Sequence, residues 1–299
     1  MMLGEGLLPA AEGTTPADPV VLGYDGSPAS AAALHWAARQ AGALQCPLQL
    51  VHAVHEYWLM PQATHYDAVI AAARGLLQSG ARQAEALVPG LHVSTHVHSG
   101  DVVGALSELS ASARLVVLGT DKRDAGSGEL TGAVSQQVAV MSFAPVAVIP
   151  PLDLSLAAGV VVGTDGSAEA RQAVAAAAAE ASMIGTDLLV LTSCAISPTE
   201  AWAQTPGGEE YERVVAASQG ILDKAVSAVT ASYPGISVSS RLETQLPAAE
   251  ALISAASAAR LLVVGSLGRG AVRRMLLGSV SHKVLLNPPC PTLITRLPQ

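Results

Sequence analysis

The sequence repeats itself, and this repeat limits the possible folds more than any other feature. Three blocks recur in the same order, in the pairs VVLGYDGS (20–27) and VVVGTDGS (160–167), ARLVVLG (113–119) and ARLLVVG (259–265), and APVAVI (144–149) and CPTLIT (290–295). Matched blocks in one order indicate a duplicated structural unit. A chain of 299 residues is long enough for two domains, each with its own core. We therefore expect two copies of one domain.

The repeat also predicts the domain boundaries. We expect an N-terminal tail at 1–18, a first domain at 19–150, a linker at 151–157 and a second domain at 158–299. Pro150 and Pro151 stop the preceding strand and begin the linker. The tail contains no Lys or Arg, whereas a secretory signal starts with basic residues, so we do not interpret it as one.

Composition narrows the classes of partner. The net charge is −8 and the pI is about 5.4, so nucleic acid is not expected as the main partner. Apolar residues make up 50% of the chain but aromatics only 3%, which suits helices packed closely on buried parallel strands. No apolar stretch is long enough to cross a bilayer, and we expect a cytoplasmic protein.

Short apolar runs alternate with helical stretches in each copy. In the first copy we expect strands at 19–24, 48–54, 91–97, 115–119 and 146–149, with helices at 28–43, 66–88, 103–113 and 134–141. Ser27 would cap the first helix, and Pro28 suits its first position. Strands separated by helices need crossover connections, so the pattern predicts a parallel, doubly wound α/β sheet.

Two loops of the second copy directly follow predicted strands. They would lie at the carboxyl ends of the strands, where ligands bind in open parallel sheets. One, at 163–167, reads GTDGS; its Asp165 could accept hydrogen bonds from a sugar or a base. The other begins at Gly265 and reads GSLG, then nine residues, then GSVS. Gly265 and Gly268 can adopt positive φ and can let a ligand approach the backbone closely.

The GSVS segment at 278–281 is predicted to open a helix. Its free backbone N–H groups and serine hydroxyls would favour a phosphate. Each feature alone is better explained as ordinary structure, because Gly278 suits any helix start and Asp165 any turn. Their combination at the edges of one crevice favours a binding site.

This spacing resembles the nucleotide-binding motif of the universal stress protein family, over nearly all of the chain after residue 18. The resemblance implies a tandem member: two Rossmann-like domains of the adenine nucleotide alpha hydrolase kind, each a five-stranded parallel sheet flanked by helices. It implies ATP as the ligand, with Mg²⁺ as a companion ion, and leaves AMP, ADP and cAMP open. The site residues it implies are Gly163, Thr164, Asp165, Ser193, Val264, Gly265, Gly268, Arg269, Gly278, Ser279, Val280 and Ser281.

The resemblance also implies roles. Asp165 would meet the base and ribose, Gly265 and Gly268 the ribose and phosphates, and 278–281 the phosphate chain. For Arg269, a phosphate contact and a solvated surface position are both open. Ser193 departs from the family, which often has an apolar residue against adenine there.

The first copy departs further. Lys122 replaces the second glycine and Ala133 replaces the serine, while Asp121 adds negative charge where phosphates would lie. Lys122 would either reach a phosphate or block the backbone approach. We expect a weaker second site, or none, and its candidate residues are Gly23, Asp25, Gly119, Lys122, Gly132, Val134 and Ser135.

Histidines gather in the first copy. His92, His96 and His98 would share one face of the third strand, at a sheet edge. We expect no metal site, because neither a cysteine nor a pair of carboxylates is near. His52 and His55 are interpreted as strand-end residues.

Three classes of function follow. The leading hypothesis is an adenine-nucleotide-binding stress-response regulator that changes its conformation or partner contacts, with a cyclic-nucleotide binder as a variant. A slow ATPase is the alternative enzyme, although no Walker lysine or acid–base pair accompanies the loop. A nucleotide-independent interaction protein is the third. Strands at 146–149 and 292–295 would be sheet edges, so we expect a homodimer through them.

Overall fold

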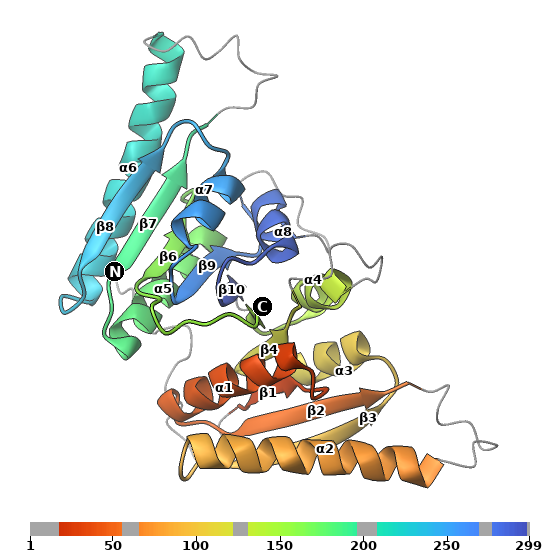
Figure 1. Ribbon diagram of the computed structural model, residues 1–299. Helices are drawn as coiled ribbons and strands as arrows, with labels where there is room; N and C mark the ends of the chain where they lie inside the picture. Colours follow the sequence, from red (N-terminus) through yellow and green to blue (C-terminus); the bar gives the residue numbers. More distant parts are fainter. Residues whose placement is uncertain (1–17, 56–65, 122–130, 196–207, 269–276, 298–299) are drawn as a thin grey trace. The chain divides into compact units, whose positions relative to one another are not determined.

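The computed structural model describes residues 18–55, 66–121, 131–195, 208–268 and 277–297 (Figure 1). The chain divides into two compact units between Leu152 and Asp153. Within the described ranges, no helix is both long and apolar enough to cross a membrane.

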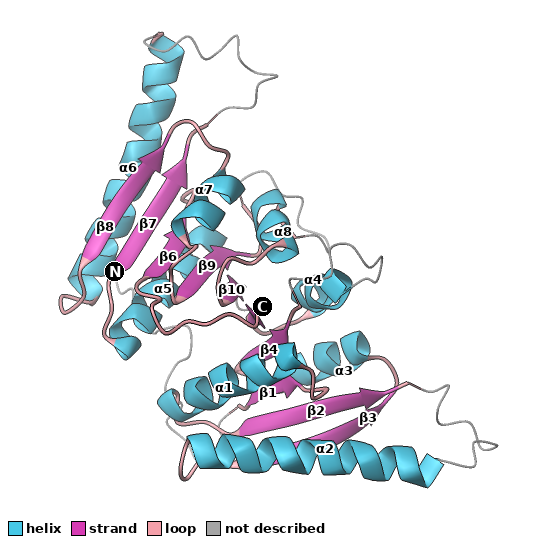
Figure 2. Ribbon diagram, in the orientation of Figure 1, coloured by secondary structure: helices cyan, strands magenta, loops and turns pink. Residues whose placement is uncertain are grey.

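The first unit alternates strands and helices as the sequence predicts. Its elements are β1 (Val20–Gly23), α1 (Pro28–Ala43), β2 (Leu48–Val54), α2 (Tyr66–Leu87), β3 (Val93–Ser99), α3 (Val102–Leu109), a 3₁₀ turn (Ser110–Ser112), β4 (Leu115–Gly119), α4 (Thr131–Met141) and β5 (Val146–Ile149). The strands are parallel, in the order β3-β2-β1-β4-β5. Helices α1 and α2 pack together, as do α3 and α4 (Figure 2).

The second unit repeats this plan. Its elements are β6 (Val160–Gly163), α5 (Ala168–Ile184), β7 (Leu188–Ser193), α6 (Glu209–Ser232), β8 (Val238–Glu243), α7 (Ala248–Ala255), β9 (Leu261–Gly265), α8 (Ser279–Leu286) and β10 (Thr292–Thr295). The strands are parallel, in the order β8-β7-β6-β9-β10, which is the same order as in the first unit. Both units are therefore five-stranded, doubly wound α/β sheets, which confirms the predicted fold class.

The core of each unit lies between its sheet and its helices. The inner strands are continuous apolar runs because both of their faces are covered, and Val20, Val21 and Leu22 of β1 are completely buried. In α1, Ala33, Ala37 and other small residues are equally buried, so the helix lies close to the sheet. The many alanines and few aromatic residues of the sequence permit this close packing.

The turn that follows the first strand has the same backbone in both units. Gly26 and Gly166 both have φ of +79°, a conformation that favours glycine. The serine after each glycine caps the next helix: the hydroxyl oxygens of Ser27 and Ser167 each accept a backbone N–H at 3.1 Å. The predicted cap at Ser27, with Pro28 in the first helical turn, is confirmed.

One strand differs from the sequence prediction by two residues. β3 covers Val93–Ser99, whereas the apolar pattern predicted 91–97. The chain is still turning at this point, because Gly90 has a φ of +88° and the N–H of Leu91 donates to the carbonyl of Val88. Pairing with β2 begins only where Val93 lies beside Leu48.

Candidate functional site

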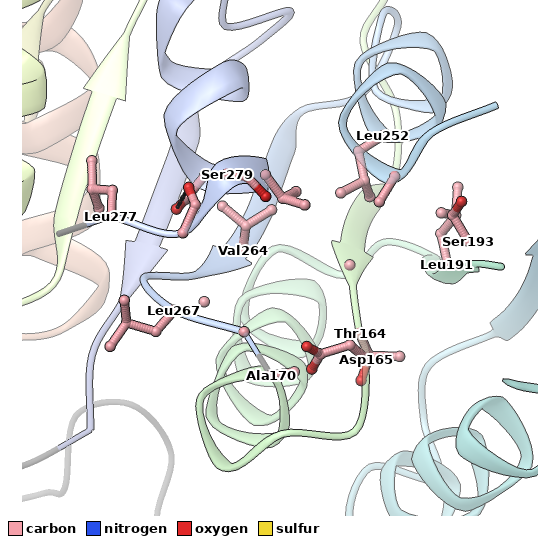
Figure 3. A pocket seen from close by; sticks show the side chains of 17 residues that line it. Thr164, Asp165, Ala170, Leu191, Ser193, Leu252, Val264, Leu267, Leu277 and Ser279 are labelled. Atoms are coloured by element: carbon pink, nitrogen blue, oxygen red, sulfur yellow. Dashed lines mark hydrogen bonds between the residues drawn. The ribbon is translucent and has the colours of Figure 1, made fainter. Parts of the chain in front are cut away.

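A cavity of about 610 Å³ opens beyond the carboxyl ends of β6 and β9 in the second unit (Figure 3). β6 pairs with β7 on one side and β9 on the other, so the cavity lies where the strand order reverses. Every predicted second-copy residue that the structure describes lines it: Gly163, Thr164, Asp165, Ser193, Val264, Gly265, Gly268, Gly278, Ser279, Val280 and Ser281. Arg269 lies outside the described residues.

Asp165 supplies the charge in the wall. Among the lining residues that the structure describes, it is the only ionisable one. Its Oδ1 accepts the backbone N–H of Ser167 at 2.9 Å, which orients the carboxylate. A Cβ added at Gly268 would lie 2.8 Å from Oδ2, so the carboxylate occupies the space that a side chain at position 268 would need.

Gly265 and Gly268 can adopt positive φ, but neither does so in this structure. Both glycines are explained by close contact instead. A Cβ at Gly265 would lie 3.1 Å from the backbone carbon of Glu169, where β9 ends against α5. The positive-φ glycine near this cavity is Gly166, in the loop after β6.

The N-terminus of α8 faces the cavity without a side-chain cap. Gly278 is the N-cap, with φ −63° and ψ 154°, and no side-chain hydrogen bond closes the first turn. Its N–H donates to the carbonyl of Ser266 at 2.8 Å, and its carbonyl accepts the N–H of His282 at 2.9 Å. The N–H groups of the first three helical residues have no acceptor within the helix. The predicted helix start at Ser279 is confirmed.

The two serines of this segment differ in their surroundings. Ser281 is 1% exposed, and its hydroxyl lies 2.9 Å from the carbonyl of Gly278 and 3.1 Å from that of Ser266. Ser281 thus links the loop after β9 to the first turn of α8. Ser279 is exposed on the cavity, and its hydroxyl has no partner in the described chain. Of the two, Ser279 therefore has the available hydroxyl.

An apolar wall completes the cavity, and sequence reasoning missed most of it. Leu191, Ala248, Leu252 and Val264 line this side, together with Leu267 and Leu277 near the glycine loop (Figure 3). Ala248 and Leu252 are four residues apart and share one face of α7. That spacing was the available signal, but nothing local related α7 to the glycine loop.

Ser193 holds two segments of this wall together. It ends β7, and its hydroxyl donates to the carbonyl of Leu246 at 2.8 Å. The N–H of Ala195 donates back to the same hydroxyl at 3.3 Å. The polar side chain is thus used in tying β7 to the turn before α7.

An equivalent cavity of about 460 Å³ lies in the first unit. Of the predicted residues, Gly23, Asp25, Gly119 and Val134 line it. Ser135 is only 2% exposed and Gly132 lies within α4, while Lys122 is outside the described residues.

The helix beside this first cavity starts earlier than its counterpart. α4 begins at Thr131, before Gly132, whereas α8 begins after the matching Gly278. Val134 and Ser135 therefore lie beyond the first three helical positions, and their N–H groups donate within the helix. The N–H groups of Val280 and Ser281 are free in α8, whereas those of their counterparts Val134 and Ser135 are bonded within α4.

The histidines of the first unit separate into two groups. His96 and His98 lie in the edge strand β3 with ring centroids 6.1 Å apart, and His92 precedes the strand. Across the described ranges, no group of three or more His, Cys, Asp or Glu side chains is placed to hold a metal ion. His52, by contrast, lies within β2 and lines the first cavity.

Comparison with known proteins agrees with this architecture. The profile of the Universal stress protein family matches residues 16–150 and again 159–296. A universal stress protein of Mycobacterium tuberculosis is 31% identical over 307 residues, covering 94% of this chain and 95% of the relative. A second, from Mycolicibacterium smegmatis, is 30% identical over 292 residues, covering 93% and 96%.

Among solved structures, a universal stress protein from Archaeoglobus fulgidus superposes with a TM-score of 0.71 at 20% identity, covering 94% of this chain and 99% of that one. At this identity the likeness concerns the fold alone. The doubled profile match and the full-length relatives show that the chain belongs to the universal stress protein family, with the family's domain present twice in tandem.

Proposed function

We propose that the second unit binds an adenine nucleotide, with ATP as the first choice, and that the chain acts as a stress-response regulator through nucleotide-dependent conformation or partner contacts. One observation carries the proposal. The uncapped N-terminus of α8 and the carboxylate of Asp165 line the same apolar cavity, with glycines at Gly268 and Gly278.

The phosphate end is supported by what the first turn of α8 offers. Three backbone N–H groups and the Ser279 hydroxyl are available donors, and the positive end of the helix dipole favours an anion. Gly278 is a suitable N-cap with an ordinary φ, and an added Cβ would come no closer than 3.5 Å to any atom of the described residues. Without a side chain at this position, the space beside the helix start is open to a ligand that approaches the backbone.

The base and ribose end is supported by the opposite wall. Leu191, Leu252 and Val264 provide apolar surface for a flat heterocycle, and Asp165 provides an acceptor for a hydroxyl or amino group. A volume of about 610 Å³ is within the range of small-molecule sites. A ligand with an apolar ring, a donor-bearing middle and an anionic tail fits this order of groups.

The first experiment is to denature the purified full chain and identify any released nucleotide by chromatography. About one adenine nucleotide per chain is expected from a single tight site. Ser279→Ala should release much less nucleotide, because it removes a hydroxyl donor from the proposed phosphate site. The variant should still fold, because this hydroxyl makes no contact within the described chain. Ser240→Ala, an exposed serine of β8 that does not line the cavity, is the matched control.

The outcomes separate the classes of function. No released nucleotide, together with no thermal shift on adding ATP, refutes the proposal and favours a nucleotide-independent interaction protein. ATP turnover that Ser279→Ala abolishes would assign a slow ATPase. Competition between ATP and cAMP for the wild-type chain decides which nucleotide the cavity prefers.

A further inference from the structure

The first-unit cavity is lined differently from the nucleotide cavity proposed in the second unit. Its polar lining includes Asp25, His52, Thr120 and Asp121. By the repeat, Asp121 stands where the second unit has Leu267, which lines the other cavity. The difference concerns the kind of ligand the cavity can hold, because α4 also lacks two of the N–H donors described for α8.

His52, which lines this cavity, stands where the second unit has a different residue type. Val20 pairs with Leu48 as Val160 pairs with Leu188, so His52 corresponds to Thr192. The Thr192 hydroxyl donates to the carbonyl of Thr164 at 2.7 Å, and His52 Nδ1 lies 2.8 Å from the carbonyl of Tyr24.

That contact determines which nitrogen carries the hydrogen. A carbonyl oxygen only accepts, so Nδ1 of His52 must hold a hydrogen. In the neutral ring, Nε2 is then an acceptor. The exchange of threonine for histidine keeps the bond to the backbone and adds a second ring nitrogen to a side chain that lines the cavity.

Asp25 adds a carboxylate. Its Oδ1 accepts the N–H of Ser27 at 2.9 Å, and the side chains of Ser27 and Ser30 also bond to the carboxylate. Partial burial raises the pKa of Asp25, but hydrogen bonds from Ser27 and Ser30 outweigh it and hold the pKa below its usual value. Asp25 is therefore ionised at neutral pH.

Thr120 gives an independent indication of a ligand. It is 6% exposed and lines the cavity, and its hydroxyl has no hydrogen-bond partner in the described chain. Its counterpart Ser266 is equally buried but does not line the second cavity. This side chain therefore offers a hydroxyl to which a ligand in the cavity can bond.

The geometry points to a separate binding site in the first unit for a small organic cation, with an amidine or primary amine on a compact apolar body. The carboxylates of Asp25 and Asp121 and the Nε2 of His52 accept hydrogen bonds, and an amidinium or ammonium group only donates. The apolar body would contact the remaining lining, which includes Val51, Ala53, Val102, Leu118 and Val134. This site does not depend on nucleotide binding by the second unit.

Benzamidine is the probe, titrated into the full chain by calorimetry, with the uncharged benzamide as its near-isostere. Saturable binding of benzamidine at one site is expected, at least about tenfold tighter than benzamide. Asp25→Asn should weaken benzamidine about tenfold or more, since the amide still accepts from Ser27 but carries no charge. Asp165→Asn, the matching change in the second unit, should leave it unchanged.

His52→Thr is the second variant, and it restores the residue type that the second unit uses for the same backbone bond. It should fold, as checked by thermal unfolding, and weaken benzamidine severalfold. The inference is overturned if benzamidine shows no saturable binding up to about 10 mM, a concentration that would detect even weak sites. It is also overturned if benzamide binds equally well, or if Asp165→Asn weakens binding as much as Asp25→Asn does.

Discussion

Replacing Gly278 with alanine is expected to impair ligand binding while leaving the folded protein nearly as stable. Among the described residues, the nearest atoms to an added Cβ are backbone atoms of Ser266, Leu267 and Gly268, all at 3.5 Å, which is ordinary contact. The backbone angles at Gly278, φ −63° and ψ 154°, suit any residue. The methyl group would stand between the glycine loop and the start of α8, in the space that an anion on that helix needs.

The magnitudes separate clearly. An alanine N-cap is worse than glycine by roughly 0.5–1 kcal/mol, and the stiffer unfolded chain returns about 0.4–1 kcal/mol. The free energy of unfolding without ligand should therefore change by less than about 1 kcal/mol. A lost hydrogen bond to a charged group costs about 1.5–3 kcal/mol, which corresponds to a roughly 10- to 150-fold weaker Kd for ATP.

The assay pairs calorimetric titration with ATP and urea unfolding of the ligand-free chain. Gly220→Ala is the control, because Gly220 lies in α6 and an added Cβ would meet no atom within 4 Å. It should raise stability by up to about 1 kcal/mol and leave the ATP Kd unchanged. The reasoning is refuted if Gly278→Ala binds ATP with the Kd of the wild type. It is also refuted if the free energy of unfolding of the variant is lower than that of the wild type by more than about 2 kcal/mol.

Three further substitutions test the fold and the charge state. Gly119→Ala would place a Cβ 2.4 Å from the backbone carbon of Ala29, so urea unfolding should show a loss of at least about 2 kcal/mol; a loss under about 0.5 kcal/mol would contradict the packing. Leu252→Ala removes a side chain that is 2% exposed, and it should cost about 2–5 kcal/mol and weaken ATP binding in calorimetry; unchanged affinity would remove Leu252 from the ligand wall. Because the folded-state pKa of Asp25 is depressed, its charge stabilises the fold above the unfolded pKa of about 3.9 and stops doing so as pH falls through the lower folded value. The stability advantage of wild type over Asp25→Asn should therefore be constant above about pH 5 and shrink in acid, and an advantage that grows in acid would refute this.

Local features of the sequence predicted much of the fold. The recurrence of VVLGYDGS as VVVGTDGS predicted two units, and apolar runs between helical stretches predicted their parallel sheets. The cap at Ser27 and the helix start at Ser279 also agree with the structure. These features could be predicted because periodicity, capping and turn chemistry depend on neighbours within a few residues. Pairing between chains through the edge strands stays a prediction.

The walls of the cavities are decided by tertiary structure. Leu252 lies on a helix that precedes the glycine loop, and only the sheet order brings the two together. The need for glycine at Gly265 comes from the close approach of α5 and not from a positive φ.

The sequence by itself thus determined the duplication, the sheet type and the glycine loop that lines the second-unit cavity. Tertiary structure decided which walls surround that loop, which N–H groups remain free, and that His52 belongs to a cavity. The physical reason is range: backbone conformation is largely a local property, whereas a cavity is formed by side chains from strands and helices far apart in the chain.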